Sequence, residues 1–343
     1  MFLQNFIGNN LHKKSVVSFL LLPLSIPYLI IMRCRRYLYD IGVFKQFCPQ
    51  SKIISIGNIT TGGTGKTPLT IFIAKYLRKN GSRVAVSHRG YKGKFENSIK
   101  LIADSTKIYP TAKLAGDEAK LLAYKLKGTP VIVGKSREKA IKFLERKFGN
   151  LDFIILDDSF QHLKVHHDID IIVFNSLVGL GNGFVLPSGI LREPIKSIEK
   201  ADMVIINGKK RIKQIEKFNI PVYYSTLRIK KIYDMDSNGI KPTKIQKSRN
   251  LLVSGIGNPQ SFENTLNEES INFGKHLKYP DHYNYDLQDW HKIQEESESY
   301  DYIITTEKDF MKLEEFDNKK KLVIIAVEYI VKDHNSLKEV IYE

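Results

Sequence analysis

The stretch that decides the fold is KIISIGNITTGGTGKTPLTIFIAKYLRKN, residues 52–80. Its first part, 52–56, is a short apolar run that predicts a buried strand. The last part has helical spacing, with Leu69, Ile73 and Leu77 on one face. Between them lies a glycine-rich connection whose backbone N–H groups can surround phosphates. A strand, a glycine-rich loop and a helix in this order predict a P-loop.

The loop itself carries the predicted phosphate contacts. Its glycines let the backbone turn with N–H groups pointing inward, and the following helix adds positive potential at its N-terminus. Lys66 can reach the β- and γ-phosphates of ATP, and the Thr67 hydroxyl can bind Mg²⁺. Thr60 departs from the usual pattern, which has glycine six residues before the lysine. The residues expected around the nucleotide are Thr60, Thr61, Gly62, Gly63, Thr64, Gly65, Lys66 and Thr67.

Acidic residues that can organise a metal or activate a hydroxyl follow along the chain. The run 152–156 predicts a strand that ends in Asp157 and Asp158, at the sheet edge where parallel sheets bind ligands. At least one of these carboxylates is expected at Mg²⁺. The sequence leaves open which one binds directly, and one can instead cap the next element. Asp117 and Glu118 open a helical stretch, where acids also occur simply as partners of the helix dipole.

Composition limits the partners of the chain. Its 53 Lys and Arg residues exceed its 37 Asp and Glu residues, and the net charge of +16 predicts an anionic partner. The positive charge is spread along the chain rather than interleaved with aromatic residues on one module, so we expect no nucleic-acid partner. The two cysteines, Cys34 and Cys48, lack metal-ligand spacing and indicate a reducing compartment.

The N-terminus contains the most apolar run of the chain, VVSFLLLPLSIPYLIIM at 16–32. The run is shorter than the roughly 20 residues that cross a bilayer, and Pro23 and Pro27 interrupt it. Basic residues flank both of its ends, which favours a helical element lying in the membrane interface. A core helix and a spanning helix are the alternatives.

Nine sequence blocks in one order extend over nearly the whole chain. They are SIGNITTGGTGKTP at 55–68, HRGYKGK at 88–94, GDEAKLLA at 116–123, PVIVGKSR at 130–137, DFIILDDSFQH at 152–162, GNGFVLPSGILREP at 181–194, GIGNP at 255–259, YPDHYNY at 279–285 and TTEKD at 305–309. In combination they resemble the tetraacyldisaccharide 4′-kinase family, the lipid A 4′-kinases of Gram-negative bacteria. LPSGILREP and YPDHY are not general nucleotide motifs, so the resemblance is specific.

The resemblance implies a reaction and a set of roles. The γ-phosphoryl of ATP would pass to the 4′-hydroxyl of a tetraacyldisaccharide 1-phosphate, making lipid IVA in lipid A biosynthesis. Asp117 would be the general base, with His282 as its dyad partner and Lys66 at the phosphates. The residues around Mg²⁺ would be Thr67, Glu118, Asp158 and Gln161. The residues facing the disaccharide and its 1-phosphate would be Arg89, Tyr91, Arg137, His162, Ser188 and Arg192.

Three positions depart from many members of that family. His88 stands where serine is common, Ser159 where glycine is common, and Tyr283 where a second histidine is common. The last difference leaves His282 as the histidine available for the dyad. The resemblance also implies that the N-terminal segment sits on the cytoplasmic face of the inner membrane, as a peripheral or monotopic element that helps to take up the acyl chains.

The predicted fold class is α/β. We expect a P-loop NTPase core with a parallel sheet covered by helices, a smaller C-terminal α/β lobe and an N-terminal membrane-associated helical segment. The expected division is 1–50 for the membrane segment, 51–208 for the kinase core, 209–250 for connecting strands or a hairpin, and 251–343 for the C-terminal lobe. The catalytic site is expected between the two lobes.

One alternative function is a membrane-associated P-loop GTPase or ATPase that acts on a protein partner. A GTPase is favoured by an Asn-Lys-x-Asp motif that reads the base. The nearest match in this sequence is at 306–309, where Thr306 stands in place of the asparagine.

Overall fold

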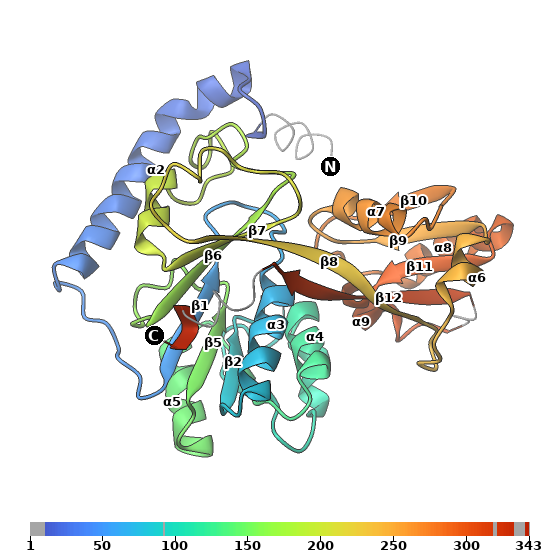
Figure 1. Ribbon diagram of the computed structural model, residues 1–343, viewed down its shortest axis with the longest axis horizontal. Helices are drawn as coiled ribbons and strands as arrows, with labels where there is room; N and C mark the ends of the chain where they lie inside the picture. The colour runs from blue at the N-terminus through green and yellow to red at the C-terminus, as the bar shows by residue number, and fades with distance from the viewer. Residues whose placement is uncertain (1–10, 92, 318–320, 333–339, 343) are drawn as a thin grey trace.

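The fold is organised by one continuous sheet, seen in a computed structural model that describes residues 11–91, 93–317, 321–332 and 340–342. Twelve strands of the described chain are hydrogen-bonded in the order β10-β9-β11-β12-β8-β7-β6-β1-β5-β2-β4-β3 (Figure 1). The strands are β1 Lys52–Gly57, β2 Val84–His88, β3 Lys100–Ala103, β4 Val131–Val133, β5 Phe153–Asp157, β6 Ile169–Asn175, β7 Met203–Asn207, β8 Val222–Tyr233, β9 Asn250–Ser254, β10 Lys275–Lys278, β11 Tyr302–Thr306 and β12 Leu322–Val331. The helices are α2 Val16–Asp40, α3 Lys66–Lys79, α4 Asp117–Lys125, α5 Arg137–Phe148, α6 Pro242–Gln246, α7 Pro259–Glu268, α8 Leu287–Glu296 and α9 Glu307–Leu313, with short 3₁₀ turns at Pro110–Leu114, Ile195–Lys200 and Ser297–Ser299.

The core half comprises β1 to β7 with α3, α4 and α5. Its strands pair in parallel, except for the short edge strand β3, and the predicted P-loop α/β core is confirmed. The strands are apolar on both faces because helices cover both faces. Ile54 packs with Leu69 of α3 on one side, and Ile53 packs with Leu144 of α5 on the other. This sandwich holds the carboxyl ends of β1 and β5 rigidly at one edge.

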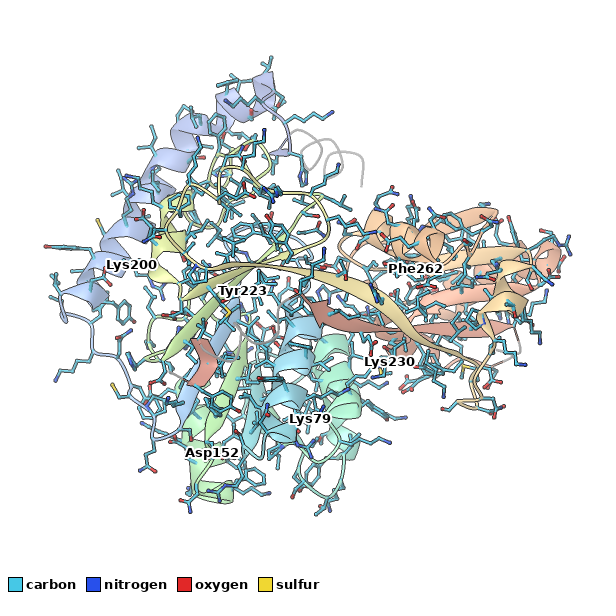
Figure 2. The ribbon with its side chains drawn as sticks, in the orientation of Figure 1. Lys79, Asp152, Lys200, Tyr223, Lys230 and Phe262 are labelled. Atoms are coloured by element: carbon cyan, nitrogen blue, oxygen red, sulfur yellow. The ribbon has the colours of Figure 1, made fainter. Side chains whose placement is uncertain are left out.

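Two long strands join the core half to the C-terminal half, which comprises β9, β10 and β11 with α6 to α9. β8 pairs in parallel with β7 and antiparallel with β12, and both strands run from one half into the other (Figure 1). Figure 2 shows Tyr223 near the core half and Lys230 beside the C-terminal half, although both lie on β8. After β12 the chain returns to the core half, where Ile341 is fully buried.

The N-terminal helix α2 packs its polar face on the protein and turns its apolar face outward. It is 25 residues long, continues through Pro23 and Pro27, and extends eight residues beyond the predicted apolar run, from Arg33 to Asp40. Ser18 and Ser25 are its buried residues. Among the described helices, α2 alone has the length and apolar composition to cross a membrane, with 11% of its most apolar window buried.

Candidate active site

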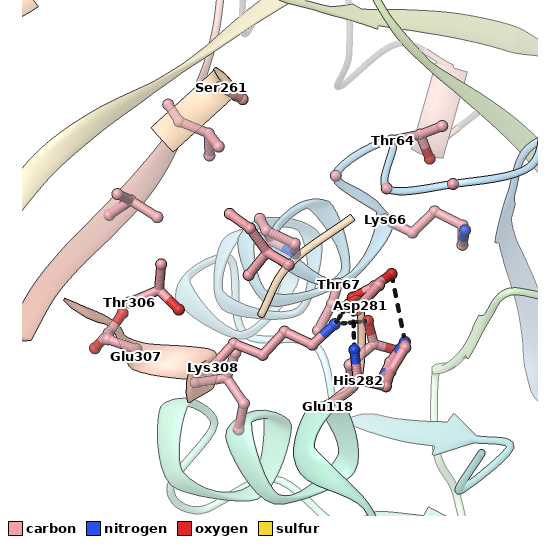
Figure 3. Close-up of a pocket in the computed structure, with 18 of the residues that line it drawn as sticks. Thr64, Lys66, Thr67, Glu118, Ser261, Asp281, His282, Thr306, Glu307 and Lys308 are labelled. Atoms are coloured by element: carbon pink, nitrogen blue, oxygen red, sulfur yellow. Dashed lines mark hydrogen bonds and ion pairs between the residues drawn. The ribbon is translucent and has the colours of Figure 1, made fainter. Parts of the chain in front are cut away.

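A pocket of about 690 Å³ lies where the two halves meet (Figure 3). The core half contributes the P-loop, the start of α4 and residues after β2. The C-terminal half contributes the start of α7, the turn after β10 and the start of α9. The polar residues that line it are Thr64, Lys66, Thr67, His88, Arg89, Tyr91, Glu118, Asp158, Arg192, Ser261, Thr265, Asp281, His282, Thr306, Glu307 and Lys308.

The P-loop forms one wall, as predicted, through Gly62 to Thr67. Gly65 has a φ of +94°, and a Cβ there would lie 2.6 Å from Asn207 Nδ2, so this position requires glycine. The first two loop residues are placed differently from the prediction. Thr60 and Thr61 do not line the pocket, because they bond to residues 190–191 and anchor the base of the loop.

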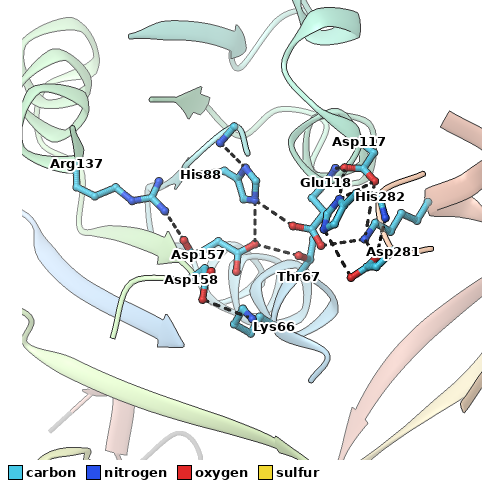
Figure 4. Close-up of polar contacts among 12 residues, drawn as sticks. Lys66, Thr67, His88, Asp117, Glu118, Arg137, Asp157, Asp158, Asp281 and His282 are labelled. Atoms are coloured by element: carbon cyan, nitrogen blue, oxygen red, sulfur yellow. Dashed lines mark hydrogen bonds and ion pairs between the residues drawn. The ribbon is translucent and has the colours of Figure 1, made fainter. Parts of the chain in front are cut away.

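The two aspartates after β5 point to different partners. Asp157 is buried, and its Oδ2 accepts a hydrogen bond from the Thr67 hydroxyl at 3.1 Å. Its Oδ1 has no hydrogen-bond partner among the described residues. Asp158 has a φ of +52°, a strained backbone conformation that aims its carboxylate at Lys66, 3.5 Å away (Figure 4). The same carboxylate lies 3.1 Å from Arg192.

The environments of these aspartates move their pKa values in opposite directions. Burial raises the pKa of Asp157, and the neighbouring carboxylate of Glu118 adds to that effect. Burial acts on Asp158 too, but the charges of Lys66 and Arg192 outweigh it and hold the pKa of Asp158 below its usual value. Asp157 is thus the aspartate whose carboxylate would gain more from a bound cation, because one of its oxygens has no hydrogen-bond partner among the described residues.

Glu118 and His88 stand beside this pair. His88 Nδ1 accepts a hydrogen bond from the Gly90 N–H at 2.9 Å, which assigns the proton of the neutral ring to Nε2. That Nε2 lies 3.4 Å from Glu118 Oε2 and 4.0 Å from Asp157 Oδ2. Burial would raise the pKa of Glu118, but His88 and Lys308 outweigh it and hold the pKa well below its usual value.

Asp117 and His282 meet although they are 165 positions apart in the chain. His282 Nδ1 lies 3.0 Å from Asp117 Oδ1 (Figure 4). Gly116, with a φ of +93°, begins α4 and turns Asp117 toward this contact. His282 also has a positive φ, +58°, at the turn after β10. The predicted dyad is therefore present in the geometry.

Within the dyad, the histidine is the member that faces the pocket. The Asp117 side chain is 6% exposed and is also held by Lys312 at 3.0 Å, whereas His282 lines the pocket. Burial favours a raised pKa for Asp117, but the hydrogen bond with His282 and the charges of Lys308 and Lys312 outweigh it and hold the pKa well below its usual value. Asp117 thus holds His282 through Nδ1, on the side of the ring away from the pocket.

Besides Thr60, Thr61 and Asp117, four residues predicted at the site lie outside the pocket lining. The Gln161 side-chain N–H donates to the Asn58 carbonyl at 2.9 Å. Ser188 is fully buried beneath α2, and its hydroxyl donates to the Ser18 carbonyl. Arg137 is buried behind β5, where it donates to the Asp157 carbonyl. Burial lowers the pKa of His162 to about 4, so that ring is neutral near pH 7.

His88, Asp281 and Lys308 are among the pocket residues that sequence reasoning missed. His88 is one of the departures from many family members, and Asp281 lies in YPDHYNY beside His282. Lys308 belongs to the TTEKD block, which was quoted for the resemblance but given no role. Its ammonium contacts Asp281 Oδ1 at 3.0 Å and Glu118 Oε1 at 3.3 Å. The signal available for His88 and Asp281 was their position inside blocks that also contain predicted site residues, whereas Lys308 had only its place in a block shared with the family.

This fold and this pocket define a class of protein. A P-loop at the carboxyl edge of a parallel sheet binds a nucleoside triphosphate, and the adjoining carboxylates and Asp–His pair suit transfer of its terminal phosphoryl group to a hydroxyl. The molecule is a P-loop phosphotransferase.

Comparison with known proteins identifies the family. The sequence profile described as tetraacyldisaccharide-1-P 4′-kinase matches residues 17–343. The chain is 33% identical to the tetraacyldisaccharide 4′-kinase of Halothermothrix orenii over 95% of this chain and 92% of that one. It is 34% identical to that of Legionella pneumophila strain Corby over 96% and 94%.

A solved structure agrees with the sequence comparisons. The crystal structure of the "apo" form of LpxK from Aquifex aeolicus in complex with ATP superposes with a TM-score of 0.77 at 27% identity, covering 95% of this chain and 99% of that one. The chain belongs to the tetraacyldisaccharide-1-P 4′-kinase family. The predicted family, fold class and kinase activity are confirmed, and the alternative of a GTPase acting on a protein partner is not favoured.

Proposed function

We propose that the pocket transfers the γ-phosphoryl group of ATP to the 4′-hydroxyl of a tetraacyldisaccharide 1-phosphate. The bond from the γ-phosphorus to its β-bridging oxygen breaks, and ADP leaves with that oxygen. A new bond forms to the 4′-oxygen, whose proton passes to the protein. The observation that carries this proposal is that the P-loop and His282 line one pocket in a chain of this family.

His282 is the residue proposed to accept that proton. Its Nδ1 faces the anionic Asp117, so the neutral ring holds its proton on Nδ1 and offers the Nε2 lone pair. The imidazolium formed after transfer is stabilised by Asp117, as in other carboxylate–histidine pairs. The base role expected for Asp117 thus becomes an orienting role, because Asp117 lies behind the ring and is nearly inaccessible.

Mg²⁺ fits the oxygen ligands beside the P-loop. We propose that the Thr67 hydroxyl, Asp157 and Glu118 hold it, directly or through water, since Asp157 Oδ1 is buried and has no hydrogen-bond partner in the described part of the chain. Bound there, Mg²⁺ would neutralise charge on the β- and γ-phosphates. Asp158, predicted at the metal, is proposed to orient Lys66 instead.

Arg89, Tyr91 and Arg192 are proposed to meet the acceptor, because all three line the pocket. Arg137 and His162 support this wall from behind. Ser188 instead connects the segment before Arg192 to α2, since its N–H donates to the Ser25 hydroxyl of α2.

We propose that α2 rests in the cytoplasmic face of the inner membrane. Its outward face is apolar, and its inward face bonds to the protein through Tyr28, which donates to the Arg192 carbonyl at 2.8 Å, and through Arg36, which pairs with Glu193. The exposed large apolar side chains of the helix include Val16, Phe19, Leu20, Leu24, Ile26, Ile30 and Ile31.

Vesicle binding tests this membrane role. The double substitution Leu20→Asp with Leu24→Asp is expected to weaken binding to anionic vesicles about tenfold or more, because two leucines no longer enter the interface. Leu287→Asp, the same change at an exposed leucine of α8, serves as the matched control. Equal vesicle binding by both proteins would contradict the proposal.

The kinase reaction is tested with γ-labelled ATP, Mg²⁺ and tetraacyldisaccharide 1-phosphate in detergent micelles. The expected result is a labelled lipid that carries one additional phosphate. Lys66→Ala is the control for contaminating kinases. A folded protein that binds ATP and yields no labelled lipid would overturn the proposed acceptor.

A further inference from the structure

Lys308 reaches into the pocket from the C-terminal half. It stands in the first turn of α9, and its side chain is 16% exposed. Its ammonium lies 3.0 Å from Asp281 Oδ1 and 3.3 Å from Glu118 Oε1 (Figure 3). It also lies 3.8 Å from Asp117 Oδ2. One cation thus contacts carboxylates from both halves of the molecule.

A continuous series of polar contacts leads from this ammonium to the P-loop. Glu118, which contacts Lys308, approaches His88 at 3.4 Å, and His88 approaches Asp157 at 4.0 Å. Asp157 then accepts the hydrogen bond from Thr67 at 3.1 Å. These contacts connect Lys308 to Thr67, at the end of the P-loop where the terminal phosphate of a bound triphosphate would lie.

Lys308 keeps its positive charge among these carboxylates. Burial alone would lower its pKa, but the carboxylates of Glu118, Asp117 and Asp281 outweigh that effect and raise it. The other lysine and arginine side chains in the described lining, Lys66, Arg89 and Arg192, come from the core half. Lys308 is the cation that the C-terminal half supplies.

We propose that Lys308 is a catalytic residue whose ammonium contacts the γ-phosphoryl group and neutralises charge on it during transfer. The inference rests on the proposed function and extends it, because it gives the C-terminal half a direct part in the chemistry. The bond to ADP breaks and the bond to the acceptor oxygen forms while Lys308 remains protonated throughout. Cations placed in this way by a second element stabilise phosphoryl-transfer transition states.

The competing explanation is that Lys308 only joins the two halves as an ion pair. The chain offers a matched control for this, because Lys120 of α4 makes a comparable contact with Glu314, just after α9, across the same helix pair. Lys120 is buried and does not line the pocket. Lys308→Met and Lys120→Met each remove one ammonium from the same interface, but only the first removes it from the pocket.

Nucleotide binding without acceptor is the first test. Lys308→Met is expected to weaken ATP binding about tenfold and to leave ADP binding unchanged, because only ATP carries the contacted group. Lys120→Met is expected to bind both nucleotides as the unmodified protein does. Equal losses for ATP and ADP, or no loss for either, would overturn the proposal.

Turnover with the lipid acceptor is the second test. Lys308→Met is expected to lower kcat about 10²- to 10³-fold, whereas Lys120→Met keeps its activity. Lys308→Cys treated with 2-bromoethylamine restores a side-chain amine and should recover most of the loss, with treated unsubstituted protein controlling for Cys34 and Cys48. A kcat for Lys308→Met that equals that of Lys120→Met would overturn the role.

The two proposals fail in different ways. If the unsubstituted protein makes no labelled lipid, the proposed acceptor is wrong, yet the ATP and ADP affinities still decide whether Lys308 contacts the γ-phosphate. If the lipid is made and Lys308→Met distinguishes neither nucleotide, only the role of Lys308 is wrong.

Discussion

The two walls of the pocket are built in opposite ways. The P-loop wall comes from consecutive residues, 62–67, whose backbone is shaped by glycines and by the start of α3. The opposite wall joins Asp117 of the core half to His282 and Lys308 of the C-terminal half. Nucleotide binding is thus a local property of one segment, whereas the proposed proton transfer depends on how the two halves are placed.

The largest effect is expected at the Asp117–His282 dyad, in the wall that both halves form. Asp117→Asn should lower kcat about 10³- to 10⁴-fold, because an amide can no longer hold the proton on His282 Nδ1 or stabilise the imidazolium. ATP affinity, measured by titration, should stay near that of the unsubstituted protein. His282→Gln should be at least as damaging if His282 accepts the proton. A nearly active His282→Gln protein would make Asp117 the base instead.

A smaller expected effect tests the P-loop wall. Lys66→Ala should lower kcat/KM for ATP about 10²- to 10³-fold, since the β- and γ-phosphates lose a charged donor. Unlike Asp117→Asn, it should also weaken binding of ATP. Affinities of both variants measured side by side check this contrast. Normal ATP binding by Lys66→Ala would contradict the expected contrast between the two variants.

The neighbouring aspartates should differ in their response to metal. Asp157→Asn is expected to raise the Mg²⁺ concentration for half-maximal activity about tenfold, because it removes the carboxylate beside Thr67. Asp158→Asn should shift this concentration less and should mainly raise the KM for ATP, through the freed Lys66. A larger Mg²⁺ shift in Asp158→Asn would reverse the assignment.

The smallest expected effects come from substituting a glycine with positive φ in each wall, Gly65 with a ψ of 24° and Gly116 with a ψ of 153°. Gly81→Ala should lower stability by about 1–2 kcal/mol, because Gly81 also has a positive φ. Gly81 has open space around it and serves as the control. Gly65→Ala and Gly116→Ala should melt at lower temperatures than Gly81→Ala, because an added Cβ would lie 2.6 Å from Asn207 Nδ2 and 2.9 Å from the Tyr91 carbonyl oxygen. In addition, Gly65→Ala should lose ATP affinity and Gly116→Ala should lose turnover. Normal function in both would show that the close contacts relax.

Much of the core half was predictable from local patterns. The strands at 52–57 and 153–157 are continuous apolar runs, and the P-loop has its own glycine signature. The edge strand β3 and the strand β10 were missed, since each has four residues and no strong alternation. The extension of α2 to Asp40 was also missed, because 33–40 is polar and becomes helical while Arg36 docks on Glu193.

The candidate site was predictable only in part. The P-loop residues and the two aspartates follow directly from a motif and a strand end. The resemblance to a known family supplied Asp117 and His282, which no spacing could connect. Ser188 and Gln161 were expected in the pocket, yet their hydrogen bonds go to Ser18 and Asn58. A polar side chain in a block that resembles the family can line the site or can support the fold. The sequence does not tell which of the two it does.

The sequence by itself determined the phosphate loop, the apolar N-terminal helix and the family. Those features depend on residues close together in the chain, where backbone geometry and hydrophobic patterning act directly. Only the tertiary structure decided that Asp157 contacts Thr67, that Asp158 contacts Lys66, and that the C-terminal half brings its own cation to the pocket. The physical reason is that hydrogen bonds and close ion pairs form only between atoms a few ångströms apart. The pairing of β8 with β12 sets which distant charged residues come that close.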